Sequence, residues 1–209
     1  MSVMDRLAYN LGRKDDVPNQ ELAKELAETK NTSDIERITA GLQDKERRIQ
    51  SNCIKVLYEI GYIDPSLIAN YSDNFVNLLR SSNNRLVWGS MTALSTIAEL
   101  KAHELYPHRE EIIRAVDKGS VITQDAGIKA LAGIAAADNA YRKELFPCLL
   151  RHLADCRPKD VAQRAEKIMV AVDNTNREAF AGLVRKRMEY LKQSQVKRLE
   201  KVLHAIEEQ

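Results

Sequence analysis

Apolar residues recur along the chain at the spacing of an α-helix. Segments such as "NFVNLLRS", "REEIIRAVDKGS" and "FPCLLRHLADC" place apolar side chains at positions i, i+3 or i+4, and i+7. No segment alternates apolar and polar residues over the length of a strand, and only 8 glycines and 5 prolines interrupt the chain. The pattern therefore predicts an all-α protein.

The predicted helices repeat at a constant spacing of 37 residues. One apolar stripe contains Ile38, Phe75, Ile112 and Leu149, followed one helical turn later by Leu42, Leu79, Val116 and Leu153. A second stripe contains Leu57, Leu94, Leu131 and Ile168, followed by Ile60, Ile97, Ile134 and Ala171. Two independent stripes that share one period indicate a repeat architecture.

Each repeat is predicted to be a helical hairpin. The first helices end near Leu42, Arg80, Lys118 and Ala154, and a longer second helix starts a few residues after each of them. The segments "IDPSL", "YSDN", "KGS" and "CRPKD" contain the Pro, Gly, Asp and Ser residues that stop one helix or cap the next. Because one hairpin cannot cover its own apolar stripe, we expect the hairpins to stack.

We predict a single domain over residues 1–209. Four hairpins cover residues 32–173, and residues 1–31 contain an additional capping helix over roughly residues 19 to 30. Residues 174–209 form a degenerate capping hairpin, in which the apolar positions have slipped to a spacing of about 35. Terminal repeats are expected to differ from the others, because one of their faces meets water.

The repeat resembles a known family. With "NRLVWGSMTALSTIAEL" and "TQDAGIKALAGIAAAD" as second helices, the 37-residue hairpin looks like a HEAT repeat, and residues 32 to 209 resemble small prokaryotic HEAT/armadillo-like proteins. The resemblance implies a right-handed α-solenoid whose second helices line a concave groove. Such grooves usually hold another protein and less often nucleic acid. The hydrophobic pattern that carries the resemblance says little about chemistry.

Angular positions on the second helices predict which residues line the groove. If Leu94 points into the core, then at 100° per residue Arg85, Trp88 and Thr92 lie on the opposite half of their helix. Shifting by the repeat gives their equivalents, with Ile122, Ala162 and Glu166 completing the rows. The predicted groove residues are Arg48, Ser51, Lys55, Arg85, Trp88, Thr92, Asp125, Lys129 and Lys159. We expect a mildly basic surface with one aromatic ring and one carboxylate near its middle.

Several of these residues have alternative, purely structural interpretations. Trp88 lies about 120° from the core centre, where a large side chain packs against the adjacent helix or contacts a ligand. Asp125 is a groove residue, a helix cap, or the partner of Lys129 one turn later. The basic row can also be an ordinary solvated helix face.

Composition narrows the classes of partner. Lysine and arginine together number 32 against 30 acidic residues, and the net charge of +2 produces no field strong enough to require nucleic acid or an anionic membrane. No stretch approaches the ~20 apolar residues that span a bilayer, and the amino terminus lacks the apolar core of a signal peptide. We expect a cytoplasmic protein without a membrane segment.

The cysteines bear on compartment and metal binding. Cys53, Cys148 and Cys156 are odd in number, which favours free thiols in a reducing compartment. Cys148, His152 and Cys156 fall at i, i+4 and i+8, so on one continuous helix they could act as zinc ligands. A fourth ligand is missing nearby, and Pro158 predicts that the helix ends around Cys156. We predict neither a metal nor a cofactor.

One enzyme class shares part of the residue set. HEAT-like alkylpurine DNA glycosylases bring a tryptophan, an aspartate and arginines together on a strongly basic concave face, and Trp88, Asp125, Arg85 and Arg48 are similar to that list. A net charge of +2 argues against such a face. The sequence contains no Gly-rich phosphate loop, HExxH helix or nucleophile elbow. We predict a non-catalytic binding or scaffold module that holds a protein, with a nucleic-acid binder or base-excision enzyme as the alternative. If the groove is not the site, the basic segment Arg185, Lys186 and Arg187 is the next candidate.

Overall fold

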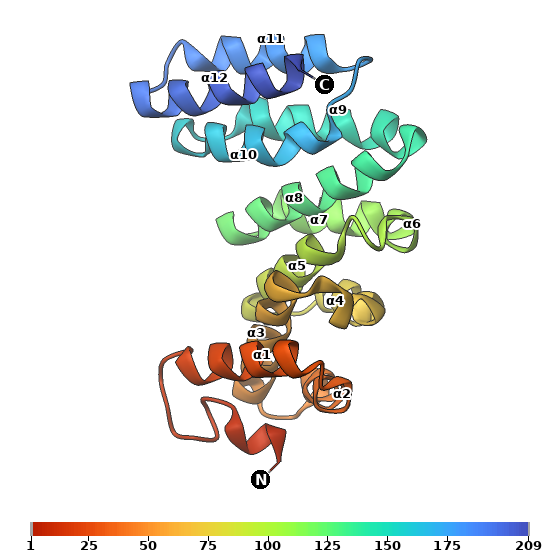
Figure 1. Ribbon diagram of the computed structural model, residues 1–209, viewed down its shortest axis with the longest axis vertical. Coiled ribbons are helices and arrows are strands. Elements are labelled where there is room, and N and C mark those ends of the chain that lie inside the picture. Colours follow the sequence, from red (N-terminus) through yellow and green to blue (C-terminus); the bar gives the residue numbers. More distant parts are fainter. Residues whose placement is uncertain (1, 209) are drawn as a thin grey trace. The chain divides into compact units, whose positions relative to one another are not determined.

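The computed structural model describes residues 2–208, and over these residues the chain forms helices and no strand (Figure 1). The prediction of an all-α protein is confirmed. The helices form two compact units, which divide in the sequence between Gly127 and Ile128, inside helix α8. A single domain over residues 1–209, with its capping regions, stays a prediction.

The first unit contains the predicted capping helix and the first hairpins. Its helices are α1 (Val17–Thr29), α2 (Thr32–Ala40), α3 (Arg47–Ile63), α4 (Ser72–Leu78), α5 (Asn84–Ile97), α6 (Ala102–Leu105), α7 (Arg109–Lys118) and the start of α8 (Val121–Ala137). Short 3-10 turns lie at Val3–Arg6, Gly41–Gln43, Pro65–Leu67, Ala69–Tyr71 and Tyr106–His108. The second helix α3 packs against α1 and against the next second helix, α5.

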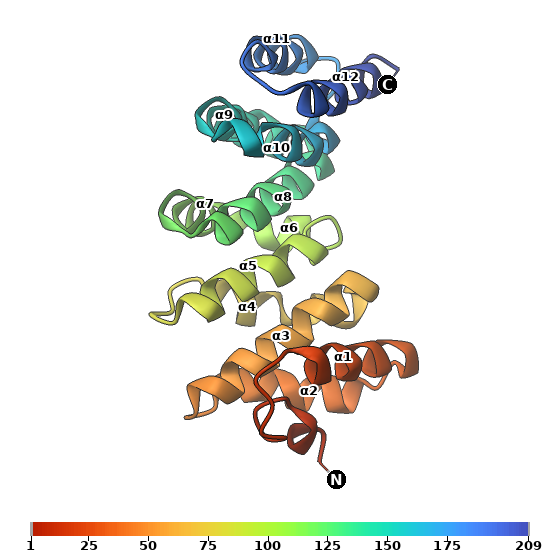
Figure 2. The same ribbon diagram turned by 90° about the vertical axis from the view of Figure 1, so that its left-hand side faces the viewer.

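The second unit contains the last hairpins. Its helices are α9 (Asn139–Asp155), α10 (Val161–Ile168), α11 (Arg177–Met188) and α12 (Gln193–Glu207), with 3-10 turns at Pro158–Asp160 and Met169–Ala171. Within this unit α12 packs against both α10 and α11, and α9 contacts both α10 and α11 (Figure 2). Among residues 2–208, none of the helices combines the length and the apolar character needed to span a bilayer.

The two apolar stripes form the core, as the 37-residue period predicts. Every stripe residue is buried, from Ile38, Leu57 and Leu94, which are 0% exposed, to Leu79, which is 8% exposed. Stripe residues of the second unit, such as Leu131 and Ile168, are also 0% exposed. Burial of apolar area is the main favourable term in folding, and the residues that repeat every 37 positions are the ones that are buried.

Polar caps follow the same period. Glu46 caps α3 by accepting a hydrogen bond from the backbone N–H of Arg48, and Asn83 caps α5 by accepting one from the N–H of Arg85. Ser120 accepts the N–H of Thr123 at the start of α8. A side-chain oxygen at this position satisfies a backbone donor that the helix leaves unpaired. The caps therefore fix where each second helix begins.

One glycine sets how closely α5 approaches α3. A Cβ atom built on Gly89 would lie 2.8 Å from Cγ1 and 3.0 Å from Cγ2 of Ile54. Both distances are shorter than ordinary van der Waals contact, so glycine is required for this packing. Trp88 is the next residue along α5, so the close approach also determines how its ring meets α3.

Candidate partner-binding surface

Arg48 and Arg85 occupy equivalent positions in successive repeats. Each is the second residue of its helix, α3 or α5, directly after the capped first turn. Arg48 is exposed and Arg85 is half-buried. Together with Ser51 and Trp88, which follow them by one turn, they form a surface that we call the arginine face. The sequence analysis predicted these four residues to share a groove.

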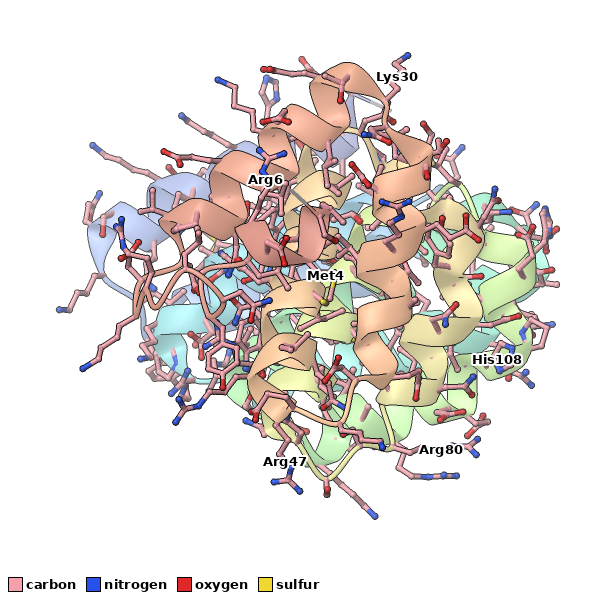
Figure 3. All side chains as sticks on the ribbon, turned by 90° about the horizontal axis from the view of Figure 1, so that it is seen from below. Met4, Arg6, Lys30, Arg47, Arg80 and His108 are labelled. Carbon is pink, nitrogen blue, oxygen red and sulfur yellow. The ribbon has the colours of Figure 1, made fainter. Side chains whose placement is uncertain are left out.

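The amino-terminal segment lies against this face and is anchored at its start. Val3, Leu7 and Ala8 are buried, at 3%, 0% and 3% exposed. Arg6 points toward α1 and donates two hydrogen bonds to the carboxylate of Glu25, at 2.8 and 2.5 Å (Figure 3). The N–H of Ala8 donates to Oδ1 of Asn19, which is itself buried. These contacts fix residues 2–8 beside α1.

The next residues, Tyr9–Asp16, cross the arginine face, and we call them the N-terminal loop. The N–H of Tyr9 donates to Oδ1 of Asn52 at 3.1 Å, and the guanidinium of Arg48 lies over the Tyr9 ring at 5.6 Å. At the other end of the loop, Nη2 of Arg85 lies 3.2 Å from each carboxylate oxygen of Asp16. One segment of the chain thus engages both arginines.

A pocket of about 440 Å³ opens between the loop and the second helices. It is lined by Ala8, Tyr9, Arg13, Lys14, Asp15, Asp16, Arg48, Ser51, Asn52 and Arg85. Four of these side chains carry a positive charge and two carry a negative charge, so the pocket is basic on balance. Arg13 and Asp15 form an ion pair within the loop, at 2.8 Å.

Trp88, within the arginine face, is half-buried and packs on α3. Its ring lies 5.7 Å from the ring of Tyr58, tilted by 51°, and the guanidinium of Arg85 lies 5.6 Å from its centre. Tyr62 stands edge-on to Tyr58 at 6.1 Å and is 58% exposed. The ring therefore packs against the adjacent helix and contacts Arg85, while its contact with a ligand stays a prediction.

Two predicted groove residues are buried and lie outside the arginine face. Thr92 is 4% exposed and donates its hydroxyl hydrogen to the carbonyl of Trp88 at 2.8 Å. Lys55 is 7% exposed, with Nζ 2.5 Å from Glu59 and 4.9 Å from the centre of the Tyr58 ring. The second helix of a hairpin contacts its own first helix and the neighbouring helices of the stack. Less of its surface is therefore exposed to solvent than the angular position of a residue on an isolated helix predicts.

Burial and hydrogen bonding oppose each other at this buried cluster. Burial alone lowers the pKa of Lys55, but its hydrogen bonds with Glu59 and Tyr58 raise the pKa above its ordinary value. Burial raises the pKa of Tyr58, and the neighbouring Lys55 only partly offsets it. Lys55 therefore stays a cation, and its contacts with Glu59 and the Tyr58 ring lie within the protein.

The remaining predicted groove residues are Ser51, Asp125, Lys129 and Lys159. Asp125 is half-buried in the second turn of α8, and Ser120, directly before that helix, accepts the N–H of Thr123. Lys129 and Lys159 are exposed in the second unit. Ser51 donates its hydroxyl hydrogen to the carbonyl of Arg47 and lines the pocket.

The loop residues Tyr9 and Asp16 were missed by the sequence analysis. They lie outside the 37-residue register, and Asp16 meets a side chain 69 positions away. The one local signal is the charged run "RKDD" directly before "VPNQ", which places two carboxylates at the start of the first helix. That signal marks a helix start and does not name Arg85 as the contact.

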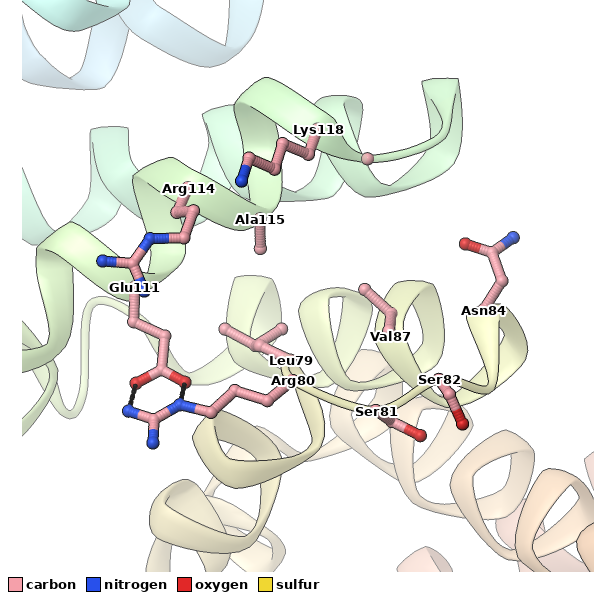
Figure 4. A pocket seen from close by; sticks show the side chains of 11 residues that line it. Leu79, Arg80, Ser81, Ser82, Asn84, Val87, Glu111, Arg114, Ala115 and Lys118 are labelled. Carbon is pink, nitrogen blue, oxygen red and sulfur yellow. Dashed lines mark hydrogen bonds and ion pairs between the residues drawn. The ribbon is translucent and has the colours of Figure 1, made fainter.

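A second pocket in the first unit has a different character. It measures about 360 Å³ and lies between the end of α4, the start of α5 and α7 (Figure 4). Arg80 and Glu111 form a two-point ion pair at its rim, with contacts of 2.5 and 2.7 Å. Arg114 and Lys118 line it from α7. No segment of the described chain occupies it in the way that the N-terminal loop occupies the arginine face.

The cysteines do not assemble a metal centre. In the part of the chain that the structure describes, no three His, Cys, Asp or Glu side chains are grouped so that they could hold an ion. Helix α9 ends at Asp155, and Cys156 continues in extended backbone, as Pro158 predicts. Burial raises the pKa of the Cys53 thiol to about 12 and also raises the pKa of Cys156.

Two of the three basic residues at the end of α11, Arg185 and Arg187, make contacts within the second unit. Arg187 donates to the backbone carbonyls of Ala154 and Cys156, which the end of α9 leaves without helical partners. Arg185 pairs with Glu207 of α12 at 3.2 Å. Arg187 thus has a structural role in joining α11 to the end of α9.

The comparisons with known proteins identify the fold. No protein-family model matches the chain, and no curated protein matches it in sequence. A designed armadillo repeat protein in complex with the peptide (KR)4 matches 97% of this chain and 99% of its own length, with a TM-score of 0.68 and 14% identity. An engineered protein matches 100% of this chain and 98% of its own length, with a TM-score of 0.67 and 17% identity.

A natural protein also has this fold within a much longer chain. Karyopherin Kap121p, in its structure bound to the SUMO protease Ulp1p, matches 96% of this chain with 22% of its own length, a TM-score of 0.66 and 15% identity. At such identities the likeness concerns the fold alone. The resemblance predicted from the 37-residue period is confirmed, and the chain has the all-α solenoid fold of HEAT/armadillo-like repeat proteins.

Proposed function

We propose that this protein is a non-catalytic binding module that holds a protein partner on the arginine face. The observation that carries the proposal is that Arg48 and Arg85, in equivalent positions of two repeats, already hold the ring of Tyr9 and the carboxylate of Asp16. A surface that binds one peptide segment has the geometry to bind another of similar chemistry.

The chemistry of the pocket favours a protein over nucleic acid. The net charge of +2 produces no field strong enough to gather the phosphate backbone of a nucleic acid. The aromatic ring within the face, Trp88, packs against Tyr58 and offers only part of its surface for stacking on a base. The designed armadillo protein with its peptide and Kap121p with Ulp1p support the same class of function by analogy of fold.

The proposal is tested by reversing the charges of the face. The single variants Arg48→Glu and Arg85→Glu, immobilised beside the wild-type chain, are each exposed to native lysate and the captured proteins are quantified by mass spectrometry. Arg47→Glu is the matched control, because Arg47 is exposed at the same helix end and does not line the pocket (Figure 3). Proteins captured by the wild type and by Arg47→Glu should be lost with both Arg48→Glu and Arg85→Glu.

Two outcomes would contradict the proposal. If both reversed variants capture the same proteins as the wild type, the arginine face is not the binding surface. If the wild type binds duplex DNA with an affinity that falls steeply as salt increases, and Arg85→Glu removes this binding, the nucleic-acid alternative is correct.

A further inference from the structure

We infer that the N-terminal loop occupies the place of the partner, and that the partner presents an acidic peptide segment which displaces the loop from Arg48 and Arg85. This inference rests on the proposed function, and it adds the chemical class of the partner and a competing segment within the chain. It is argued from how the loop is held, how Arg85 is paired, and which charges line the pocket.

The loop is held far less firmly than the segment before it. Residues 2–8 bury Val3, Leu7 and Ala8, whereas Leu11 in the loop is 47% exposed. The polar contacts that the described loop residues make with α3 and α5 are those of Tyr9 and Asp16, at its two ends. Release of these two contacts frees the loop and leaves the buried anchor in place.

The contact between Asp16 and Arg85 is incomplete. Both carboxylate oxygens meet the same nitrogen, Nη2, while Nε of Arg85 is buried without a hydrogen-bond acceptor. An arginine reaches its strongest pairing when two of its nitrogens each donate to a carboxylate. Both side chains are also partly open to water, at 40% and 42% exposed, which weakens the pair. A carboxylate that engaged two nitrogens of Arg85 would bind better than Asp16 does.

Displacement of the loop changes the charges that line the pocket. Both carboxylates of the lining, Asp15 and Asp16, belong to the loop, as do Arg13 and Lys14, so the charged lining residues that remain are Arg48 and Arg85. The third position of the arginine row is Ile122, which is 53% exposed and uncharged. The charges that match an acidic segment are therefore concentrated at the first two repeats, where the loop lies.

The loop is covalently joined to the surface that it binds, so even weak contacts let it compete with a partner peptide. A segment joined to its site by a short linker has an effective concentration on the order of millimolar, so a free peptide with the same contacts competes poorly. A partner must add contacts, and acidic side chains can add them by engaging a second nitrogen of Arg85 and by pairing with Arg48, which contacts only the ring of Tyr9 in the loop. The loop thus excludes weak ligands and admits a more acidic one.

The inference is tested by releasing the loop in the full chain. The Tyr9→Ala/Asp16→Ala variant removes the ring that Arg48 covers and the carboxylate that Arg85 binds, while the backbone N–H of residue 9 keeps Asn52 as its acceptor and the anchor at residues 2–8 is unchanged. The probe is a fluorescein-labelled peptide with the sequence of residues 9–17, "YNLGRKDDV", and the control peptide has asparagine in place of both aspartates. Binding is measured by fluorescence anisotropy.

The released variant should bind the probe at least about tenfold more tightly than the wild type, because its own loop no longer competes. The control peptide should bind neither protein, and Arg85→Glu added to the released variant should remove binding of the probe. Equal affinity for both proteins, or no binding to the released variant at millimolar peptide, overturns the inference.

Limited digestion with trypsin gives an independent measurement. Arg13 and Lys14 are cleavage sites inside the loop, and their cleavage should be several-fold faster in the released variant while the rest of the chain stays protected. Unchanged cleavage shows that Tyr9 and Asp16 do not hold the loop, which also overturns the inference. Loss of lysate partners with Arg85→Glu, combined with unchanged capture by the released variant, would sink this inference and leave the proposed function standing.

Discussion

The first two hairpins and the hairpin of α9 and α10 bury the same stripe but use their second helices differently. Leu57, Leu94 and Ile168 are equivalent in the repeat and each is 0% exposed. At the position of Ser51 and Trp88, however, α10 has Ala162, which is also 0% exposed. The position that lies in the arginine face in the first unit is thus closed in the second.

The residue one turn after Ala162 shows which helix covers this side of α10. Glu166 of α10 is equivalent to Lys55 and Thr92, and its carboxylate receives two hydrogen bonds from Arg198 of α12, at 2.8 and 2.6 Å. The final helix therefore covers a surface of α10, whereas α3 and α5 offer theirs to the N-terminal loop. The 37-residue period therefore determines which residues form the core, while the residues at surface positions differ between repeats according to what covers them.

Removing one core leucine in each unit tests whether the core is equivalent in both. Leu94→Ala and Leu131→Ala should each lower the free energy of unfolding by about 2–5 kcal/mol, because each leaves a cavity at a position that is 0% exposed. Chemical denaturation measures both. A loss below about 1 kcal/mol at either position would mean that the two units do not share one core pattern.

The tryptophan tests the difference between the surfaces. Trp88→Ala should lower the free energy of unfolding by about 2 kcal/mol, less than the ~3–5 kcal/mol of a fully buried tryptophan, because the ring is half-buried against Tyr58. Trp88→Phe is the control, since it keeps an aromatic ring on Tyr58 and should lose less.

Fluorescence examines the same residue without mutation. As the only tryptophan, Trp88 should be quenched by acrylamide to an intermediate extent, and quenching should rise in the Tyr9→Ala/Asp16→Ala variant if the loop shields the face. Complete shielding in both proteins would contradict the half-exposed position of the ring.

The part of the structure that the sequence predicts is the part that repeats. The stripes containing Phe75 and Leu94, the hairpins, and the end of α9 near Cys156 all follow from periodicity and from turn residues. Each of these features is decided within one repeat or between neighbours, so a single sequence contains enough information to place it.

The candidate site was predicted only in part, for a physical reason. Helical angle places Arg48, Arg85 and Trp88 on one face, but it treats each helix as isolated, and so it also placed Thr92 there, which neighbouring helices bury. The contact of Asp16 with Arg85 joins an irregular segment to a helix far along the chain. Such a contact has no period, and side-chain pairing at that distance cannot be derived from spacing.

Replacing a glycine by alanine should have opposite effects on stability in the two units. Gly89→Ala should destabilise the protein by about 1–2 kcal/mol, because the added methyl group would meet Ile54 at 2.8 Å. Gly182→Ala, on α11, should stabilise it by about 0.5–1 kcal/mol, since nothing lies within 4 Å and alanine favours the helix. Thermal and chemical denaturation measure both. A gain in stability at Gly89 would show that α5 does not approach α3 as closely as described.

The smallest expected effect concerns the pair that covers α10. Arg198→Ala and Glu166→Ala should each lower the free energy of unfolding by about 0.2–1 kcal/mol, because the side chains are 47% and 39% exposed and water screens their attraction. The double variant isolates the coupling energy of the pair, which should fall in the same range and shrink as salt is raised.

The Asp16 and Arg85 pair, at 42% and 40% exposed, is the matched control in the first unit, with a similar exposure but only one arginine nitrogen engaged. Its coupling should be the weaker of the two, because the carboxylate of Glu166 receives bonds from two nitrogens of Arg198. If the Asp16 pair proved the stronger, the loop would be a fixed part of the fold, and the contrast between an open first surface and a covered second one would be lost.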